Sequence, residues 1–241
     1  MRIEHEHDPD SIRRRLADGP RTHYLRDWIY GGIDGAVTTF AVVSGVVGAS
    51  LSASIVVILG VANLIADGFS MAAGNYSGTK AEQDLRQHLA SVERRHIEAD
   101  PHGEREEIRQ IFARKGFTGT LLERIVEVIT GERGRWIKTM LSEEYGLPME
   151  DRSPLKAAWA TFSAFLVCGA APLVPYLFGL ENAFGWSIGL TGTVFFTIGS
   201  VQSRWSIYPW WLTGLTTLGI GAVAASLAYG VGYLLRGFGV G

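Results

Sequence analysis

The sequence contains a single cysteine, Cys168, which lies within an apolar segment. An intrachain disulfide is therefore impossible, and a lone cysteine among apolar neighbours is typical of a small buried hydrophobic residue. The chain also lacks a basic surplus, because its 22 lysines and arginines are outnumbered by 24 aspartates and glutamates. A net charge of -2 excludes a nucleic-acid binder by bulk electrostatics, since such binding relies on basic residues that neutralise phosphates.

The amino terminus lacks the apolar core of a secretory signal. Its first ten residues, MRIEHEHDPD, are mostly polar or acidic, so we expect no cleavable signal peptide. His5 and His7 are residue types that bind metals, but a disordered, solvated tail accounts for them more simply. The segment SIRRRLAD that follows predicts a short basic helix suited to the anionic inner face of a membrane.

Charged residues are nearly missing from long parts of the chain. Most of the charge falls within residues 1–27 and 80–156, and the rest consists of apolar runs. A helix needs about 20 mainly apolar residues to cross a bilayer. The sequence therefore predicts an all-α, polytopic membrane protein with five transmembrane helices, at about residues 28–50, 54–76, 155–178, 184–201 and 210–235.

Local signals refine these spans. Pro172 and Pro175 predict a kink or a broken turn within the third span. The second span has no helix breaker before Pro101, which favours a helix that continues past Lys80. Aromatic residues expected as anchors at the membrane interface are Trp210, Trp211 and Tyr233.

The basic residues predict the orientation. Every lysine and arginine except Arg236 lies in the amino-terminal segment, in the insert from Lys80 to Lys156, or at Arg204. In a five-span topology these share one side of the membrane, and by the positive-inside rule that side is the cytoplasm. We therefore expect a cytoplasmic tail (1–27), spans one and two (28–79), a cytoplasmic helical domain (80–153) and spans three to five (154–241).

Capping signals divide the insert into amphipathic helices. Asp100 followed by Pro101 is typical of a helix start, and Gly116 of its end. Thr118 is a candidate cap for the next helix, GTLLERIVEVIT, and another helix is expected over about 133–145. The apolar stripe predicted for GTLLERIVEVIT consists of Leu121, Leu122, Ile125 and Val128.

Polar side chains interrupt the apolar character of the first two spans. Asn63, Asp67 and Met71 are four residues apart, which stacks them on one helix face. Asp34 lies about six residues into the first span, at a depth similar to that of Met71. A carboxylate within a bilayer normally faces a partner, a cavity or a transported ion. Since carboxylate and thioether together suit a borderline ion such as Fe²⁺, we interpret these four residues as a metal pathway, with Asp67 as the candidate proton carrier.

The insert carries candidate metal ligands in pairs spaced three or four residues apart on one predicted helix. This spacing points both side chains of a pair the same way. Imidazole, carboxylate and thioether donors together suit transition-metal ions. Spacing alone leaves open whether these residues bind metal or form ordinary charged helix faces. The candidates are Glu93 with His96, Glu104 with Glu107, and Met140 with Glu144, beside Glu143.

Two stretches resemble the vacuolar iron transporter family of plants, fungi and bacteria: DGAVTTFAVVSGVVGAS in the first span and ANLIADGFSMAAGNYSGTKAEQD in the second. The likeness extends from about Tyr30 through the fifth span. It implies a homodimer of five-span protomers in the lipid bilayer that moves Fe²⁺, and often Mn²⁺, out of the cytosol in exchange for protons, without an organic cofactor. The family's pathway aspartate and methionine fall on Asp34 and Met71.

The same resemblance implies a metal-binding role for the cytoplasmic domain. His96 departs from the family pattern, because it stands where a second glutamate of the first pair is expected. Imidazole is a softer and neutral ligand, so the preference among Fe²⁺, Mn²⁺, Zn²⁺ and Co²⁺ stays open. The short chain and the missing targeting peptide favour a bacterial-type member in an inner membrane. The family's other ligand positions fall on Glu93, Glu104, Glu107, Met140 and Glu144.

Two other functions stay open. Glu93-Arg94-Arg95-His96 matches the Glu-x-x-His pattern of ferritin-like di-iron proteins, which would make the chain a membrane-anchored ferroxidase. The insert has one such motif, whereas that architecture needs two. Alternatively, the chain is a metal-responsive membrane scaffold whose insert binds a partner, which leaves Asp34 and Asp67 without a role.

Overall fold

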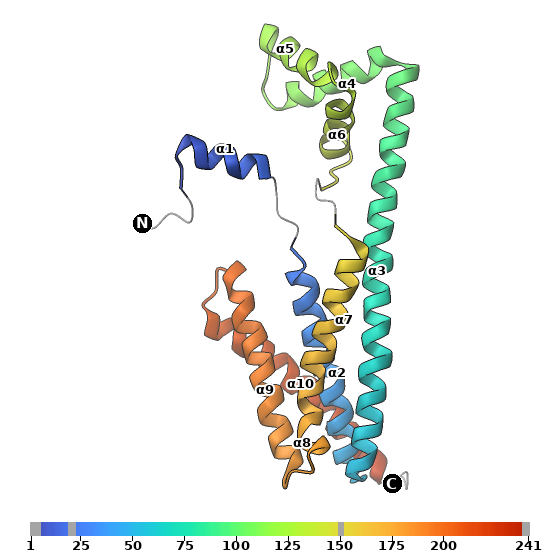
Figure 1. Ribbon diagram of the computed structural model, residues 1–241, viewed down its shortest axis with the longest axis vertical. Helices are drawn as coiled ribbons and strands as arrows, with labels where there is room; N and C mark the ends of the chain where they lie inside the picture. The colour runs from blue at the N-terminus through green and yellow to red at the C-terminus, as the bar shows by residue number, and fades with distance from the viewer. Residues whose placement is uncertain (1–5, 19–22, 149–151, 238–241) are drawn as a thin grey trace. The chain divides into compact units, whose positions relative to one another are not determined.

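The computed structural model describes residues 6–18, 23–148 and 152–237, and every regular element in these ranges is a helix (Figure 1). The all-α prediction is therefore confirmed. Two short 3-10 helices, Ala171–Leu173 and Ser203–Trp205, follow α7 and α9. The α-helices are α1 Pro9–Asp18, α2 Leu25–Gly48, α3 Ala53–Ala99, α4 Pro101–Arg114, α5 Gly119–Thr130, α6 Arg133–Glu143, α7 Pro154–Ala170, α8 Val174–Leu177, α9 Ala183–Gln202 and α10 Trp210–Arg236.

Five helical segments are long and apolar enough to cross a membrane. α2 and α10 each form one, and α3 contains another in its apolar half. The remaining two are the segments Pro154–Leu177 and Ala183–Trp205. The chain is an integral membrane protein with several spans, and the five predicted spans are confirmed, with ends that differ by a few residues.

Proline interrupts the third span as predicted. α7 ends at Ala170, a 3-10 turn follows, and α8 begins at Val174. Proline has no N–H to donate and its ring crowds the preceding turn, so an α-helix cannot continue through it undisturbed. The Pro172 carbonyl finds a partner across the bundle, because Ser187 Oγ of α9 donates to it over 2.8 Å. This bond matters in a membrane, where water cannot satisfy a freed backbone group.

The chain forms two compact units, which we describe separately. The membrane unit comprises residues 23–78 and 153–241, and the insert unit comprises residues 1–22 and 79–152. α3 is continuous over 47 residues, which confirms that the second span extends as a helix past Lys80. Its apolar half belongs to the membrane unit and its charged half to the insert unit. At 1.5 Å per residue, such a helix is about 70 Å long.

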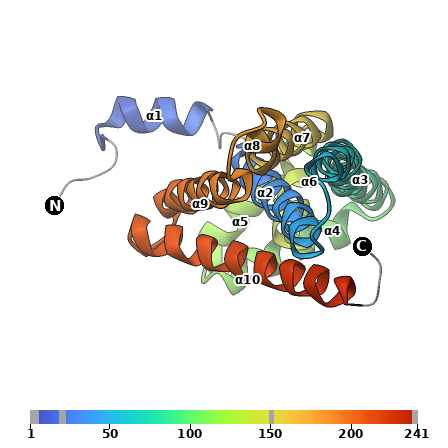
Figure 2. The same ribbon diagram turned by 90° about the horizontal axis from the view of Figure 1, so that it is seen from below.

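α2 is the central helix of the membrane unit (Figure 2). Glycines bring its backbone close to both α7 and α10. A Cβ atom added to Gly35 would lie 2.4 Å from the carbonyl oxygen of Phe165 in α7. One added to Gly232 of α10 would lie 2.1 Å from the carbonyl oxygen of Gly45 in α2. Helices in lipid associate by such close packing, because burial from water is not available as a driving force.

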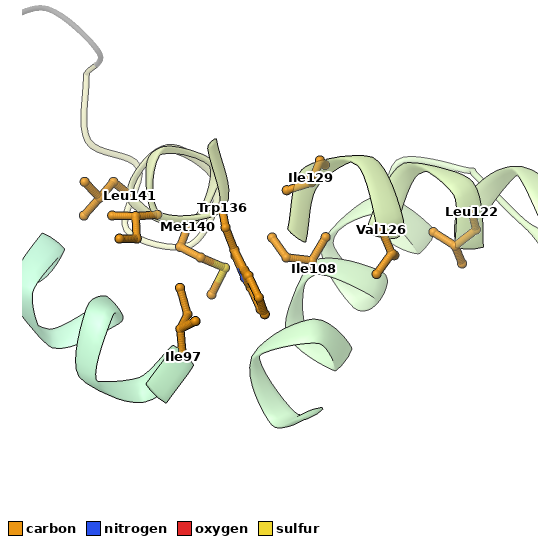
Figure 3. Packing of buried hydrophobic residues seen from close by; sticks show 9 residues of the cluster. Ile97, Ile108, Leu122, Val126, Ile129, Trp136, Met140 and Leu141 are labelled. Atoms are coloured by element: carbon orange, nitrogen blue, oxygen red, sulfur yellow. The ribbon is translucent and has the colours of Figure 1, made fainter. Parts of the chain in front are cut away.

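The insert unit has its own apolar core, built from α4, α5, α6 and the end of α3. Figure 3 shows the Trp136 side chain between Met140 and Ile97 on one side and Ile108 on the other. Ile108 and Met140 are fully buried. A contiguous apolar cluster of this kind is what allows a group of short amphipathic helices to pack as one body.

The predicted stripe of α5 is partly wrong. Leu122, Val126 and Ile129 face the core, whereas Leu121 and Val128 are 58% and 48% exposed. The buried residues follow an i, i+4, i+7 pattern, which is the period of one helix face. Leu121 and Val128 are displaced from this line by one residue toward the solvent side. Apolar identity alone did not distinguish the two faces.

Of the two N-caps predicted in the insert, that of α4 forms the expected hydrogen bond and that of α5 does not. The Asp100 carboxylate accepts a hydrogen bond from the Gly103 N–H over 3.0 Å, and Pro101 is the first residue of α4. Thr118 occupies the N-cap position of α5 in an extended conformation, but its side chain makes no capping hydrogen bond. The start of α5 is therefore fixed by packing of its apolar residues rather than by its cap.

We expect Gly35→Ala to destabilise the protein by roughly 1–3 kcal/mol, because its new methyl group would overlap the Phe165 carbonyl and force α2 away from α7. Thermal unfolding in detergent measures this. Gly189→Ala in α9 is the matched control, since nothing lies within 4 Å of its added Cβ. Equal melting temperatures for the two variants would contradict the packing argument.

Candidate metal site

Three side chains of the insert unit gather where α3 ends and α4 begins. Glu93 and His96 lie on the last turns of α3, and Glu104 lies on the first turn of α4. One ligand atom from each lies within 4.8 Å of the others. His96 Nδ1 is 3.5 Å from Glu104 Oε1 and 3.9 Å from Glu93 Oε1. The tight turn at Asp100 brings Glu104 back beside the two residues of α3.

The two carboxylates are almost completely removed from water. Glu93 is 1% exposed and Glu104 is 6% exposed, whereas His96 is open to solvent on one side. Glu93 Oε2 and Glu104 Oε2 are buried without a hydrogen-bond partner among the described residues. A buried carboxylate oxygen without a partner is costly unless it is protonated or bound to a cation. The donor set, two carboxylates and one imidazole, suits a divalent transition metal.

Tyr145 completes the surroundings of Glu93. The Tyr145 hydroxyl donates a hydrogen bond to Glu93 Oε1 over 2.8 Å. Burial and this bond to a carboxylate raise the pKa of Tyr145, so its hydroxyl stays protonated as a donor. One oxygen of Glu93 is thus held by Tyr145 and the other is left for a ligand. Sequence analysis missed this role, because Tyr145 is 52 residues away in the chain and matches no ligand motif.

Electrostatics give the site a strongly negative character. Burial, followed by the charges of Glu107, Glu93 and Glu144, raises the pKa of Glu104 from 4.5 to about 7. The pKa of Glu144 is also raised, first by burial and then by Glu93 and Glu107, while His96 lowers it. Glu104 and Glu144 therefore hold a proton more readily than a solvent-exposed carboxyl group does. A bound divalent cation would relieve this repulsion and displace the proton of Glu104.

The other residues singled out in the insert have different surroundings. Glu107 and Glu144 are exposed but act on Glu104 through their charges. Met140 lies in the apolar core of the insert unit. Glu143 is paired with Lys115 at 2.5 Å. The structure thus brings together Glu93, His96 and Glu104, with Glu107 and Glu144 near enough to add charge.

The intramembrane candidates lie on α2 and α3. Asp34 is half-buried, and Asp67 is exposed on the surface of the single chain. The two carboxylates are close enough to interact electrostatically. Asn63 Nδ2 donates to Thr38 Oγ1 over 3.3 Å, and Thr38 Oγ1 in turn donates to the Asp34 carbonyl over 2.9 Å. Neither Asp34 nor Asp67 has a basic partner among the described residues.

Met71 lies further along α3, in the part that approaches the charged half of this helix. It is half-buried and packs against the apolar cluster that contains Leu64 and Phe165. It shares with Asn63 and Asp67 the four-residue spacing of one helix face. The thioether therefore lies on the same stripe as the two polar residues, next to the packed interior of the membrane unit.

A buried polar network in the membrane unit was not recognised from the sequence. Asp27 is only 5% exposed, and its carboxylate accepts a hydrogen bond from Asn75 Nδ2 over 2.9 Å. The same amide nitrogen lies 2.7 Å from Thr161 Oγ1. These three residues connect α2, α3 and α7. Sequence analysis assigned Asp27 to the amino-terminal tail, whereas the structure begins α2 at Leu25.

Five helices of membrane-spanning length and composition define a polytopic membrane protein, and two buried carboxylates beside an imidazole are donors that suit a metal cation. Comparison with known proteins agrees with this class. The family model described as VIT family matches residues 25–233, and the chain belongs to this family. The resemblance found in the first two spans is confirmed.

Several curated relatives match over most of their length. The chain is 31% identical over 252 residues to the vacuolar iron transporter of Toxoplasma gondii, covering 95% of this chain and 82% of the relative. It is 30% identical to vacuolar iron transporter 1 of Oryza sativa subsp. japonica, covering 94% and 89%. It is 29% identical to vacuolar iron transporter 1 of Arabidopsis thaliana, covering 85% and 83%.

The raised pKa of Glu104 predicts how metal-free stability depends on pH. The folded protein keeps this proton up to a pH of about 7, whereas an unfolded chain releases it near 4.5. The folded state therefore binds more protons in this window, and its stability falls as the pH rises from about 4.5 to 7. Glu104→Gln should remove this loss and stabilise the metal-free protein above pH 7, by on the order of 1–3 kcal/mol.

Thermal unfolding with a chelator at pH 5 and pH 7.5 measures the effect. Glu127→Gln is the matched control, because Glu127 forms an exposed ion pair with Arg124 that contributes little to stability. Glu104→Gln should also weaken divalent-metal binding, since it removes a charged donor. A variant that is no more stable than the wild type at pH 7.5 would contradict the buried-charge argument.

Proposed function

We propose that this protein is a secondary transporter that exports Fe²⁺, and also Mn²⁺, from the cytosol in exchange for protons. The carrying observation is the pair Asp34 and Asp67, two carboxylates within a membrane segment that have no basic partner among the described residues. An ionised group in lipid costs at least about 2.5 kcal/mol at the bilayer centre. A cation that passes beside them would remove this cost. The printed names of the relatives, vacuolar iron transporters, support iron as the cargo.

The pathway residues divide into two roles. Asp34 and Met71 offer a carboxylate and a thioether, a combination that favours a borderline ion such as Fe²⁺ over Mg²⁺ or Ca²⁺. Asp67 is the proposed proton carrier, because an exchange of metal for protons needs a second acidic group beside the carboxylate that holds the ion. Asn63 supports the pathway by its hydrogen bond to Thr38, one turn from Asp34.

The insert unit is the proposed site of metal capture. Glu93, His96 and Glu104 form its centre. The additional candidate ligands are Glu107, Glu144 and Met140, of which Met140 lies in the neighbouring apolar core. The distribution of lysine and arginine supports a cytoplasmic location for this unit and the amino terminus. Metal would bind where the cytosol supplies it and then reach Asp34. We propose a bacterial inner membrane as the location. His96 would favour softer ions such as Zn²⁺ and Co²⁺ as additional cargo.

A homodimer is the proposed functional form. The membrane half of α3 leaves Ile65 and Phe69 at least 60% exposed, and the exposed Asp67 lies between them on the sequence. A carboxylate on such a surface should not face lipid. A second copy would cover this part of α3 and enclose Asp67 in a cavity on the two-fold axis, because a symmetric interface uses the same surface on both subunits.

Transport into proteoliposomes tests the function. We expect Asp34→Asn to reduce Fe²⁺ flux by at least about tenfold, because the ion loses its charged partner in a low-dielectric segment. Asp67→Asn should abolish the dependence of flux on an imposed pH difference. Glu181→Gln, in the exposed turn before α9, is the control and should transport normally. Gel filtration checks that each variant is folded.

Two results would contradict this function. Full transport by Asp34→Asn would remove the role of the carboxylate pair. Stoichiometric oxygen consumption on adding Fe²⁺ would instead favour the ferroxidase, because a transporter leaves the oxidation state of its cargo unchanged. Comparing Fe²⁺, Mn²⁺, Zn²⁺ and Co²⁺ at two internal pH values would also measure the cargo preference.

Cross-linking tests the dimer. The native cysteine, Cys168, is 5% exposed and should not react. Any cross-link therefore involves the cysteine that is introduced on the surface. Ser70→Cys on the exposed part of α3 should give a cross-linked species of twice the mass in membranes. Val223→Cys, on the 62% exposed surface of α10, is the control and should not. The reverse pattern would show that α3 faces lipid and that the copies meet elsewhere.

A further inference from the structure

An apolar groove follows the contact between α2 and α10 in the membrane unit. The two helices touch through Gly45 and Gly232, and the groove lies beside this contact with a volume of about 480 Å³. That volume falls within the usual range of ligand cavities, roughly 300–1,000 Å³. Its walls are small and aliphatic side chains, including Val42, Ala228 and Val231. One charged residue, Arg236, also lines the groove.

Arg236 is unusual in both its position and its surroundings. It is the one lysine or arginine of the whole sequence outside residues 1–27, residues 80–156 and Arg204. It is the last residue of α10 and is exposed, and its guanidinium forms no ion pair or hydrogen bond among the described residues. Tyr233, one turn earlier, is 61% exposed. Exposed aromatic residues near the end of a spanning helix mark the headgroup level of the bilayer, so Arg236 lies at the depth of lipid phosphates.

We propose that this groove binds one phospholipid with an anionic headgroup. The acyl chain would lie along α2 and α10, and the phosphate would accept hydrogen bonds from Arg236. The guanidinium presents several donors in a planar fork that matches phosphate oxygens. A purely apolar groove would accept any lipid tail, whereas this cation selects by charge. A second protein copy is a poorer occupant, because it would cover the groove and bury Arg236. The residues that line the groove include no carboxylate that could pair with this cation.

This inference is independent of the proposed metal transport. None of Asp34, Asp67, Met71 or the insert residues lines the groove. The site lies instead at the carboxyl ends of α2 and α10, beside Leu51 of the α2–α3 loop. A bound lipid would hold these two helix ends together at the membrane surface.

Lipid binding to the full-length protein tests the proposal. The purified protein is titrated with phosphatidylglycerol or phosphatidylcholine of identical acyl chains, and bound lipid is counted by native mass spectrometry. We expect one phosphatidylglycerol per protomer, bound about tenfold more tightly than phosphatidylcholine, with a preference that weakens as salt is raised. Arg236→Gln should abolish the preference between the headgroups. Arg204→Gln, a second exposed arginine at the end of a spanning segment, should retain it.

A second variant examines the groove itself. Ala228→Leu should fill the groove and reduce binding of both lipids, whereas Ala222→Leu, on an exposed position of the same helix, should not. Equal affinity of the wild type for the two headgroups would overturn the proposal. So would an unchanged preference in Arg236→Gln. If Ala228→Leu changes only the ratio of monomer to dimer, the groove is a protein interface and the lipid site is refuted.

Discussion

The cost of removing carboxylates from water is the constraint on which this structure depends. Asp34 and Asp67 lie within membrane helices, and Glu93 and Glu104 are buried in the insert unit. In both places the acidic groups are near one another and form no ion pair with a lysine or arginine in the described part of the chain. A protein that only needed stability would replace such groups with apolar side chains. Retaining them is consistent with a cation that binds and leaves.

The two sites meet this constraint by different means. In the insert unit, Tyr145 satisfies one oxygen of Glu93, and a raised pKa allows Glu104 to hold a proton near neutral pH. The site can therefore exist without metal in a partly protonated form and can release protons when a cation arrives. In the membrane unit, Thr38 and Asn63 form hydrogen bonds near Asp34, but neither residue neutralises its charge.

Much of the architecture could be predicted from the sequence, because its signals are local. Apolar runs of membrane length fixed the five spans, Pro172 and Pro175 marked the interruption of the third, and Asp100 with Pro101 marked the start of α4. The pairing of Glu93 with His96 is also local, since three residues on a helix determine it. What failed was the choice between neighbouring apolar positions in α5, where Leu121 and Val128 face solvent.

Long-range contacts explain the remaining omissions. The bond between Tyr145 and Glu93 and the network of Asp27, Asn75 and Thr161 each join residues that are distant in the chain. No periodicity encodes such pairings, because they arise from the crossing of helices. Asp27 in particular carries a charge typical of a tail, yet it is enclosed by helix packing. Sequence patterns therefore indicated candidate metal ligands but not the side chains that form hydrogen bonds with them.

The hydrogen bond between Glu93 and Tyr145 connects the two ends of the helical segment that contains α4, α5 and α6. A segment whose ends meet at a single point behaves as a closed loop, and closing it costs chain entropy once rather than at each contact. A cation bound at that point would connect both ends of this segment. Cation binding and folding of the segment would then be thermodynamically coupled. Cellular proteases would therefore degrade the metal-free protein faster than the metal-bound one.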